Sequence, residues 1–382
     1  MKRKIAILGS TGSIGVQTLD VVEQHRDMFE VELLTANNNV ELLAAQARKF
    51  NPNSVVICNG EHYGTLSSLL KDEDTKVFAG IDSVVGLVKI LNADIVVAAM
   101  VGFSGLLPTI EAIKSGKAVA LANKETLVAA GALVTKAAKE NKVPILPVDS
   151  EHSAIFQSLQ GEKATVEKLI LTASGGPFRN AGKDEIYNAT REQALKHPNW
   201  NMGAKVTIDS ASMMNKGLEM IEASWLFGVP AEQIDIVVHP QSIIHSMVQF
   251  SDGSVKAQMG MPDMRVPIQY ALSYPYRLDL NTPRVDFPKL GELTFQAPDM
   301  ERFPALSLAF EAHRAGGNMA CIMNGANEAA VNAFLNGRIL FGKIPEIIEK
   351  CMKKCSFVKN PSLEDIFETH RQAVCTAQDF CR

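Results

Sequence analysis

Two carboxylates and a hydroxyl stand together where a buried strand is expected to end. Residues 143–146 form an apolar run that predicts a short strand, and Asp149, Ser150 and Glu151 follow it within a few positions. Open α/β sheets bind their ligands at the carboxyl ends of strands. Carboxylate oxygens are hard ligands that suit Mg²⁺ or Mn²⁺. We therefore predict a divalent-cation site, and metal-assisted chemistry, at this point of the chain.

A glycine-rich turn predicts a nucleotide near the start of the chain. Residues 9–15 read Gly-Ser-Thr-Gly-Ser-Ile-Gly, directly after the apolar run 4–8 and at the beginning of a predicted helix. Glycines permit a tight turn and let backbone N–H groups approach a pyrophosphate at the helix N-terminus. Such a turn can also join a strand to a helix with no ligand bound, but the alternating strands and helices around it favour nucleotide binding. The candidate contacts are Thr11, Gly12, Ser13 and Ile14.

Three asparagines follow the second predicted strand. They are Asn37, Asn38 and Asn39, and they stand where NAD enzymes usually carry an acid for the ribose hydroxyl. No acid opposes a 2′-phosphate here, and no Lys or Arg is present to pair with one. The run therefore favours NADPH over NADH only because it contains no acidic residue.

Asn123, Lys124 and Glu125 follow another predicted strand and begin a helix. Asn123 suits the N-cap, and Glu125 suits the positive end of the helix. These roles leave Lys124 unexplained. It either holds a substrate oxygen or a nearby carboxylate, or it is a solvated lysine of the first helical turn.

A polar helical face is predicted from about residue 211. At 3.6 residues per turn, Ser212, Asn215, Lys216 and Glu219 fall within an arc of about 100°. An ordinary solvated face is the plain alternative, although Ser and Asn are indifferent helix formers. Hydroxyl, amide and ammonium groups on one face suit a phosphate, and Glu219 would complete the metal site begun by the two earlier carboxylates.

The segment 197–203 carries Trp200 among polar residues. The segment is either a loop anchored by its tryptophan or a flap that closes over substrate, with His197 reaching an anion. Ser174, which two glycines follow, is either part of a turn or a hydroxyl placed for a phosphate.

Short β-branched runs that alternate with helical stretches predict the elements that hold these residues. Their spacing suits a parallel sheet, so the fold class is α/β, with an N-terminal doubly wound Rossmann-type domain, a central α+β catalytic domain and a C-terminal helical bundle. The predicted strands are 4–8, 31–35, 54–57, 95–98, 118–121, 144–146, 168–172, 234–238 and 242–250, and the predicted helices include 153–159, 305–314, 318–335, 343–355 and 362–378.

The predicted domains follow from the same pattern. Residues 1–150 are expected to bind NADPH, and residues 151–275 to carry catalysis and the metal. Residues 276–304 read as a linker and 305–382 as the helical bundle.

Composition excludes several classes of protein. The 382 residues are 46% hydrophobic and 21% charged, with a net charge of −4 and no basic run, which argues against a nucleic-acid partner. We find no apolar signal core and no apolar span of ~20 residues, so no membrane contact is expected. Six cysteines without a zinc-type pair fit a cytoplasmic protein with reduced thiols.

These motifs, in this order, resemble the 1-deoxy-D-xylulose 5-phosphate reductoisomerase family. The match includes Leu-Ala-Asn-Lys-Glu, Pro-Val-Asp-Ser-Glu-His-Ser-Ala, His-Pro-Asn-Trp-Asn-Met-Gly, Asp-Ser-Ala-Ser-Met-Met-Asn-Lys-Gly-Leu-Glu and, at 324–328, Asn-Gly-Ala-Asn-Glu. The resemblance covers essentially the whole chain. It implies a homodimeric enzyme that uses NADPH and a divalent cation to rearrange and reduce a phosphorylated deoxy-ketose to 2-C-methyl-D-erythritol 4-phosphate, in non-mevalonate isoprenoid precursor biosynthesis.

The resemblance also implies residue roles. The metal ligands would be Asp149, Glu151 and Glu219, and Lys124, Ser150 and Glu151 would lie at the reacting end of the substrate. Further substrate residues, several around the phosphate, would be Ser174, His197, Ser210, Asn215 and Lys216. Cofactor contacts would come from Thr11 to Ile14, Asn39, Asn123, Glu125 and Gly203, and the flap would contain Trp200 and Met202.

One departure from the family concerns the cofactor. Many members have Gly-Lys-Asn where this chain has Asn37, Asn38 and Asn39, so a cation expected near the 2′-phosphate is missing. The implied rearrangement proceeds either by retro-aldol cleavage and recombination or by a direct α-ketol shift, and the residues suit both.

Two other classes of protein remain as alternatives on the residues alone. Another Rossmann oxidoreductase, such as a homoserine or semialdehyde dehydrogenase, would share the first domain, but a semialdehyde dehydrogenase needs a central nucleophilic cysteine and residues 59–320 contain none. A nucleotide sensor without catalysis would keep the glycine-rich turn and have no need of three metal-binding carboxylates.

Overall fold

A computed structural model describes residues 2–200 and 202–382 of the chain. The chain divides into two compact units. Unit 1 consists of Met1–Thr126, Val134–Ser153 and Asp263–Thr282, and unit 2 of Leu127–Leu133, Ala154–Pro262 and Pro283–Arg382.

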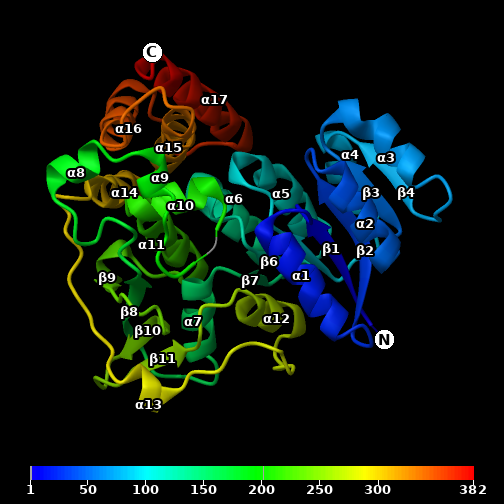
Figure 1. The fold of residues 1–382 in the computed structure, drawn as a ribbon, viewed down its shortest axis with the longest axis horizontal. Coiled ribbons are helices and arrows are strands. Elements are labelled where there is room, and N and C mark those ends of the chain that lie inside the picture. The colour runs from blue at the N-terminus through cyan, green and yellow to red at the C-terminus, as the bar shows by residue number, and fades with distance from the viewer. Residues whose placement is uncertain (1, 201) are drawn as a thin grey trace. The chain divides into compact units, whose positions relative to one another are not determined.

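In the described part of unit 1, seven strands form one parallel sheet (Figure 1). Their spatial order is β4, β3, β2, β1, β5, β6, β7, so the order reverses between β1 and β5. Ligands of such doubly wound sheets bind at this switch point, outside the carboxyl ends of the strands. The strands are β1 (Arg3–Leu8), β2 (Phe29–Ala36), β3 (Ser54–Ile57), β4 (Lys76–Ala79), β5 (Ile95–Ala98), β6 (Ala118–Leu121) and β7 (Ile145–Pro147).

Amphipathic helices connect these strands and cover the sheet. The first helix, for example, buries Leu19 and Val22, which are one turn apart and so share a face. The helices are α1 (Ser13–Gln24), α2 (Val40–Phe50), α3 (Tyr63–Leu69), α4 (Ile81–Ile90), α5 (Leu106–Lys114), α6 (Lys124–Asn141) and α12 (Arg265–Ser273), with short 3₁₀ turns η1 (Gly60–His62) and η2 (Gly102–Gly105), and α7 (Ser150–Ser158) begins in this unit.

Unit 2 combines a mixed sheet with helices. Among its described residues, four strands lie in the order β11, β10, β8, β9, with β10 antiparallel to β8 and β9 parallel to it. The strands are β8 (Val166–Ala173), β9 (Ile234–Val238), β10 (Ile244–Phe250) and β11 (Val255–Met259), and the helices are α8 (Lys183–Tyr187), α9 (Arg191–Ala194), α10 (Ala204–Ala211), α11 (Met214–Phe227), α13 (Phe287–Leu290), α14 (Pro304–Ala315), α15 (Met319–Leu335), α16 (Lys343–Lys354) and α17 (Leu363–Phe380), with a 3₁₀ turn η3 (Ala231–Gln233).

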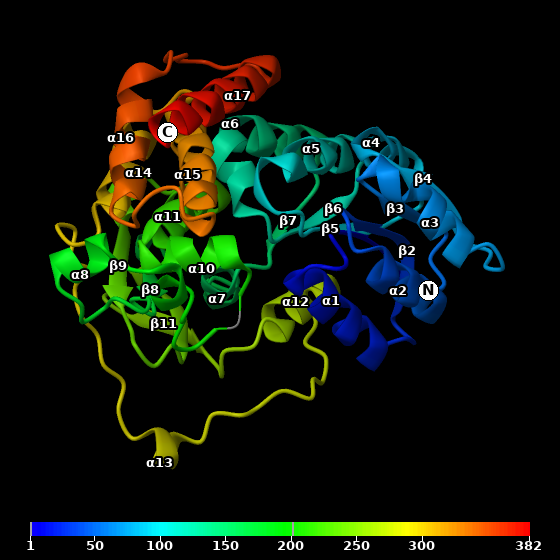
Figure 2. The same cartoon turned by 45° about the horizontal axis from the view of Figure 1, so that its top comes forward.

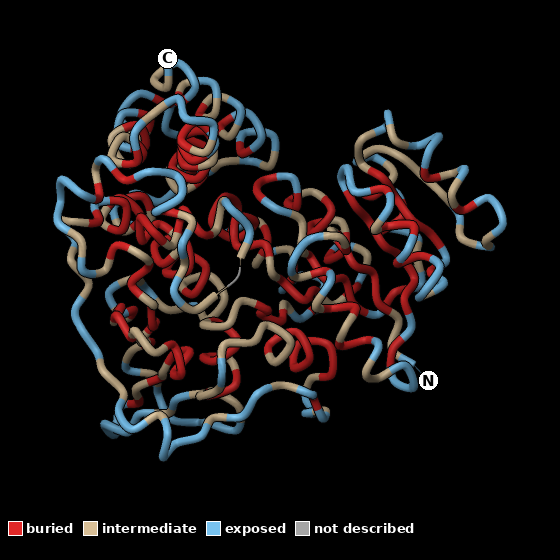
Figure 3. Tube along the Cα trace, viewed as in Figure 1, coloured by how far each residue is buried: buried red, intermediate tan, exposed pale blue. Residues whose placement is uncertain are grey.

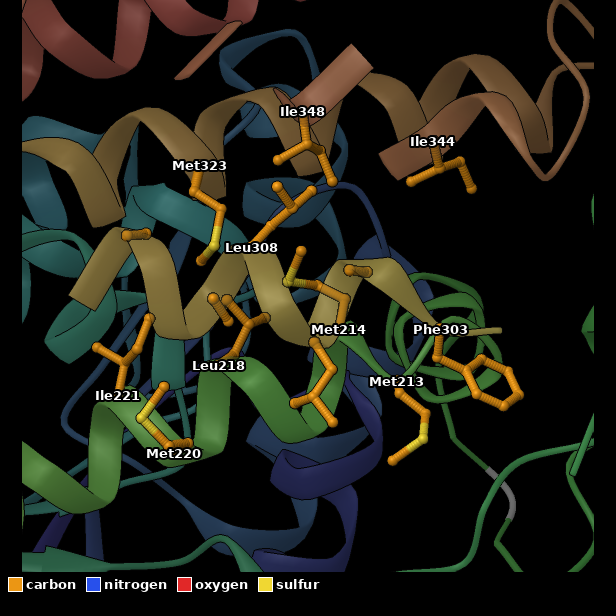
Figure 4. Packing of buried hydrophobic residues seen from close by; sticks show 14 of the residues in the cluster. Met213, Met214, Leu218, Met220, Ile221, Phe303, Leu308, Met323, Ile344 and Ile348 are labelled. Carbon is orange, nitrogen blue, oxygen red and sulfur yellow. The ribbon is translucent and has the colours of Figure 1, made fainter. Parts of the chain in front are cut away.

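The C-terminal helices share one hydrophobic core with α11. Figure 4 shows Leu218 of α11, Leu308 of α14, Met323 of α15 and Ile348 of α16 within this core, and each of these side chains is buried. Burial of each such side chain contributes about 1.5–3 kcal/mol. The predicted helical bundle therefore does not enclose a separate core. Its apolar side chains pack in the same core as those of α11.

Helices α11 and α14 approach each other closely at Gly217. A Cβ atom built on Gly217 would lie 2.5 Å from the Cβ of Ala309, a separation that real side chains do not tolerate. Glycine on one helix and alanine on the other thus let the two backbones pack directly. This contact supports the part of α11 that carries Lys216 and Glu219.

The predicted fold class is confirmed, and the structure adds elements that the sequence pattern did not predict, among them β4, β11 and α12. Strand β4 was missed because it is an edge strand without a buried apolar run, β11 because its side chains are exposed or half-buried, and α12 because Pro267 stands in its first turns. Proline is tolerated there since first-turn N–H groups have no partner within the helix.

The helix predicted from about residue 211 begins at Met214, and the prediction that it includes Ser212 is wrong. Met213 has φ of +60°, a left-handed conformation that separates α10 from α11. Ser212 caps the end of α10 and does not share the polar face of Asn215, Lys216 and Glu219. Sequence periodicity could not reveal this break, because a single residue with positive φ leaves the apolar spacing on either side intact.

The segment between α12 and α14 contains little regular structure besides α13, and its role as a linker stays a prediction (Figure 2). Its residues are largely exposed (Figure 3), and within unit 2 it is tied to β9 by an isolated bridge between Val238 and Gln296. No helix in the described part of the chain is long and apolar enough to cross a membrane.

Candidate active site

Lys124 and Asp149 form a buried ion pair in unit 1. Lys124 follows β6 and Asp149 follows β7, and since these parallel strands are neighbours their carboxyl ends lie together. The Nζ of Lys124 lies 2.7 Å from Oδ2 of Asp149, and their side chains are 9% and 12% exposed. The alternative of a solvated first-turn lysine is therefore excluded.

Asp149 is held in its ionised form. Burial raises the pKa of this carboxyl, but the charge of Lys124 and the hydrogen bond from His152 outweigh burial and hold the pKa well below its usual range. Asp149 also begins α7, because its Oδ1 accepts the backbone N–H of Glu151 at 3.2 Å. An ionised carboxylate fixed at a strand end is suited to a divalent cation.

Ser150 and Glu151 interact directly on the first turn of α7. The Oγ of Ser150 donates to Oε2 of Glu151 at 2.6 Å, and both residues are half-buried. The carboxylate therefore orients the hydroxyl. His152, which sequence reasoning did not select, is fully buried, with Nδ1 3.4 Å from Oδ1 of Asp149.

Asn123 is the N-cap of α6, as predicted. Its Oδ1 accepts the N–H of Thr126 at 2.9 Å, and its Nδ2 donates to the carbonyl oxygens of Met100 and Gly102. The side chain thereby fixes the loop that follows β5. A contact between Asn123 and the cofactor stays a prediction.

The glycine-rich turn has the geometry that a close backbone approach requires. Gly9 has φ of +90°, and a Cβ there would lie 2.7 Å from the carbonyl oxygen of Ala99. Gly12 is the N-cap of α1 without a side-chain cap, and Gly12 and Ser13 are exposed, while Thr11 and Ile14 are half-buried. The N-terminus of α1 is thus accessible at the carboxyl end of β1, as an anion site at a helix end requires.

The three asparagines after β2 are exposed and partly committed to local structure. Asn39 caps α2 by accepting the N–H of Leu42 at 3.1 Å, and Oδ1 of Asn38 accepts a hydrogen bond from Nδ2 of Asn59 at 3.0 Å. The cap and the link to Asn59 were not predicted from the sequence. Asn39 is therefore the one asparagine of the three whose side chain caps a helix.

Glu219, Lys216 and Asn215 form a buried polar group on α11. Lys216 is 4% and Glu219 is 1% exposed, and both Lys216 and Asn215 donate to the carboxylate of Glu219. A solvated helix face is excluded, because two of these three residues are almost fully buried. Buried charges need such partners, so this face is built around the carboxylate.

Ser174 and His197 lie in contact in unit 2. The Oγ of Ser174 is 3.0 Å from Nε2 of His197, and Nδ1 of His197 accepts the backbone N–H groups of Asn199 and Trp200 at 3.2 and 2.9 Å. Burial lowers the pKa of His197 to about 4, so the ring is neutral at pH 7. Since Nδ1 is an acceptor, the single ring proton is on Nε2.

Ser210 lies against the turn that follows Ser174. Gly176 has φ of +64°, and a Cβ there would lie 2.7 Å from the carbonyl oxygen of Ser210. The two glycines after Ser174 therefore serve this close packing as well as the turn. The structure brings Ser174, His197 and Ser210, all predicted to bind the substrate, into one neighbourhood of unit 2.

The predicted flap rests on the loop before β10. Nδ2 of Asn199 donates to the carbonyl oxygen of Pro240 and to Oγ of Ser242, each at 2.8 Å, and the ring of Trp200 lies 6.0 Å from that of His245. Asn199 was not selected from the sequence. Of the predicted flap at 197–203, Asn201 lies outside the described residues, and Gly203, which is exposed, begins α10.

A doubly wound sheet with a glycine-rich turn after its first strand defines an α/β protein of the Rossmann class. The comparisons narrow this class. Residues 5–131 match the family model for 1-deoxy-D-xylulose 5-phosphate reductoisomerase, and residues 145–227 and 259–375 match two models of its C-terminal domains.

Close relatives carry the same name. The chain is 58% identical over 373 residues to the 1-deoxy-D-xylulose 5-phosphate reductoisomerase of Phocaeicola vulgatus, covering 98% of this chain and 97% of that protein. The enzyme of Pelodictyon phaeoclathratiforme is 54% identical over 379 residues, with 99% of each chain covered. The chain belongs to the 1-deoxy-D-xylulose 5-phosphate reductoisomerase family.

Solved structures agree with this assignment. The Zymomonas mobilis enzyme in complex with NADPH superimposes with a TM-score of 0.94 at 45% identity, over the full length of both chains. A DOX-P reductoisomerase in complex with NADPH, fosmidomycin and magnesium gives a TM-score of 0.95 at 39% identity, covering 99% of this chain and 98% of that one.

Proposed function

We propose that this chain is an NADP-dependent oxidoreductase that rearranges and reduces 1-deoxy-D-xylulose 5-phosphate to 2-C-methyl-D-erythritol 4-phosphate, a step of non-mevalonate isoprenoid precursor biosynthesis. The similarity over 98% of the chain to an enzyme named for this substrate carries the proposal. The polar groups buried at the strand ends of unit 1 and on α11 of unit 2 agree with it, because they offer carboxylates for a cation and donors for a phosphate.

The divalent cation is assigned to Asp149, Glu151 and Glu219. Three carboxylates are a donor set that suits Mg²⁺ or Mn²⁺, and the depressed pKa of Asp149 keeps its oxygens available. A cation bound there supplies polarisation of a carbonyl group and acidification of a neighbouring hydroxyl.

Lys124 and Ser150 are assigned to the reacting end of the substrate. Lys124 is buried, charged and held by Asp149, so its ammonium can donate to an oxygen that gains negative charge. Ser150 is oriented by Glu151 and can donate to, or accept from, a substrate hydroxyl. Lys124 is buried and Ser150 is half-buried, which limits the access of water to this end.

The phosphate of the substrate is assigned to Ser174, His197, Ser210, Asn215 and Lys216. Ser174, Ser210 and Asn215 offer uncharged donors, and Lys216 is an ammonium group. The neutral ring of His197 donates from Nε2 to Oγ of Ser174, so it orients that hydroxyl for the phosphate without adding charge. A dianionic phosphate is thus matched by one cation and several dipoles, a pattern suited to binding and release at every turnover.

NADPH is assigned to the switch point of unit 1. Thr11, Gly12, Ser13 and Ile14 lie at the N-terminus of α1 for the pyrophosphate, and the exposed Asn37, Asn38 and Asn39 lie at the end of β2 for the 2′-phosphate. Asn123, Glu125 and Gly203 are the remaining proposed contacts.

The proposal is tested by oxidation of NADPH with the purified protein. Turnover is expected with 1-deoxy-D-xylulose 5-phosphate, in the presence of Mg²⁺ or Mn²⁺ and not after chelation, with the product identified by mass spectrometry. Homoserine and aspartate semialdehyde are the matched control substrates for other Rossmann oxidoreductases. Turnover of a control substrate alone, or cofactor binding without any turnover, would refute the proposal.

We further propose that the enzyme is a cytoplasmic homodimer. The family resemblance supports the dimer, and the free state of all six cysteines agrees with a reducing compartment. Light scattering of the purified protein measures the mass, for which twice 41.5 kDa is expected. Fractionation of cells that express the chain tests the compartment.

A further inference from the structure

The Asn-Gly-Ala-Asn-Glu motif at 324–328 lies in α15, away from every residue assigned above. Its second asparagine, Asn327, is fully buried and donates from Nδ2 to Oδ1 of Asp209 at 2.8 Å. Asp209 lies on α10, is 1% exposed, and directly precedes Ser210. A hydrogen bond between two buried side chains therefore joins α15 to the helix that carries a residue assigned to the phosphate.

The other oxygen of Asp209 is engaged within α10. The Nζ of Lys205, one turn earlier, lies 2.9 Å from Oδ2 of Asp209. The amide of Asn327 can have only one orientation, because exchange of its oxygen and nitrogen would place Oδ1 against the carboxylate. A buried carboxylate that loses one of two such partners is left desolvated, which is strongly unfavourable.

The end of α10 is fixed from a second element as well. Gly176, in the turn after β8, approaches the carbonyl oxygen of Ser210 so closely that no side chain fits between them. Consecutive residues of a helix point about 100° apart, so a fixed Asp209 also fixes the direction of the Ser210 side chain. The contact with α15 acts on the side chain of Asp209, and the contact with Gly176 acts on the backbone of Ser210.

We propose that Asp209 and Asn327 are positioning residues whose buried hydrogen bond sets the orientation of Ser210 and thereby the affinity for the phosphate group of the substrate. This inference rests on the proposed function, because it uses the assignment of Ser210 to a phosphorylated substrate. Neither residue touches the substrate in this account. The motif at 324–328 thus affects the phosphate site through a buried hydrogen bond and not through contact with the substrate.

Three variants test the hydrogen bond. Asn327→Leu removes the donor with little change in volume. Asn327→Asp keeps the shape, but it places a second carboxylate against that of Asp209. In the double variant Asp209→Asn/Asn327→Asp, the new amide donates to residue 327 and still offers its oxygen to Lys205, so both contacts are restored.

The expected result is a change in substrate affinity alone. Each single variant is expected to raise the KM for 1-deoxy-D-xylulose 5-phosphate, and the Kd for fosmidomycin measured by calorimetry, by tenfold or more, with the KM for NADPH changed less than twofold. The double variant is expected to recover most of the loss. Should Asn327→Leu fail to fold, Asn327→Asp and the double variant still test the inference.

Asn324→Leu is the matched control. Asn324 is equally buried on the same helix, but its Nδ2 donates to Glu328 of α15 at 2.9 Å and not to α10. It is expected to lower Tm as Asn327→Leu does, without raising the KM. An equal rise in KM for the control, or a double variant no better than the single ones, overturns the inference. If the wild-type protein does not turn over this substrate, the proposed function is refuted and this inference with it. If the wild-type protein turns over normally and the single variants have an unchanged KM, the inference alone is refuted.

Discussion

The Nε2 atom of His197 lies 3.0 Å from the Oγ atom of Ser174, and the Nδ1 atom of the same ring accepts two backbone N–H groups. The ring is therefore a fixed donor toward Ser174. Because Oγ of Ser174 also accepts the N–H of Gly176, its own proton points elsewhere and is available to a ligand. Ser174 and His197 therefore act together to present one hydrogen-bond donor to a ligand.

His197 is expected to remain neutral, with its proton on Nε2, at every pH above about 5. Burial lowers its pKa to about 4, so protonation begins only as the pH falls toward that value. The neutral form is favoured in the folded chain, so this residue adds stability above its ordinary pKa of 6.5 that is lost as the pH falls toward 4. NMR of ¹⁵N-histidine, with His197→Gln for assignment, measures both the tautomer and the titration. A ring that titrates near 6.5 would contradict this account.

Glu219→Gln is expected to weaken metal binding and to lower kcat severely, with the affinity for NADPH almost unchanged. Glu219 is 1% exposed, and loss of its charge removes a metal ligand and leaves Lys216 without its carboxylate. The loss of one charged ligand is expected to remove several kcal/mol of transition-state stabilisation. Turnover is measured across a Mg²⁺ titration, with the exposed Glu167→Gln as control. Near-normal activity at limiting Mg²⁺ would remove Glu219 from the metal site.

Lys216→Ala is expected to raise the KM for the phosphorylated substrate by roughly tenfold or more, since a charge-assisted hydrogen bond contributes about 1.5–3 kcal/mol. Steady-state kinetics measures the change, with Lys168→Ala as the control because Lys168 forms an exposed pair with Asp235. If Tm changes and the KM does not, Lys216 stabilises the buried carboxylate of Glu219 and does not bind the phosphate.

Asn38→Lys is expected to increase the preference for NADPH over NADH by a few-fold at low salt. The side chain is exposed at the end of β2, and an exposed charge pair contributes only about 0.2–1 kcal/mol, which salt screens. The kcat/KM values for both cofactors at two salt concentrations measure this preference. Asn92→Lys is the control, since it adds the same charge before β5, at the opposite end of the parallel sheet. An unchanged ratio would show that Asn38 does not face the 2′-phosphate.

Local sequence predicted most of what lies at strand ends. Asp149, Lys124 and the glycine-rich turn each follow an apolar run, so the run and the polar residues after it identify both the strand and the site edge. The structure confirms the sheet and the ion pair that these patterns imply. An element without a buried run, such as β4, gave no such signal.

Contacts between distant segments could not be predicted in this way. Asp209 and Asn327 are 118 residues apart, and neither belongs to a pattern that names the other. Lys216 and Glu219 were assigned to one face by helical spacing, but the spacing did not show that both side chains are buried. Helical spacing predicts the direction in which a side chain points, whereas tertiary packing determines which residues cover it.

The direct contact between Gly217 and Ala309 has a consequence for folding during synthesis. A ribosome adds about 5–20 residues per second, so α11 waits on the order of 5–20 s before α14 is made. During that time the side of α11 that packs on α14 has no partner, whereas strands β1 to β7 of unit 1 have already been made. The nascent chain is therefore expected to expose this side of α11 to chaperones, and the contact at Gly217 forms only after α14 has been made.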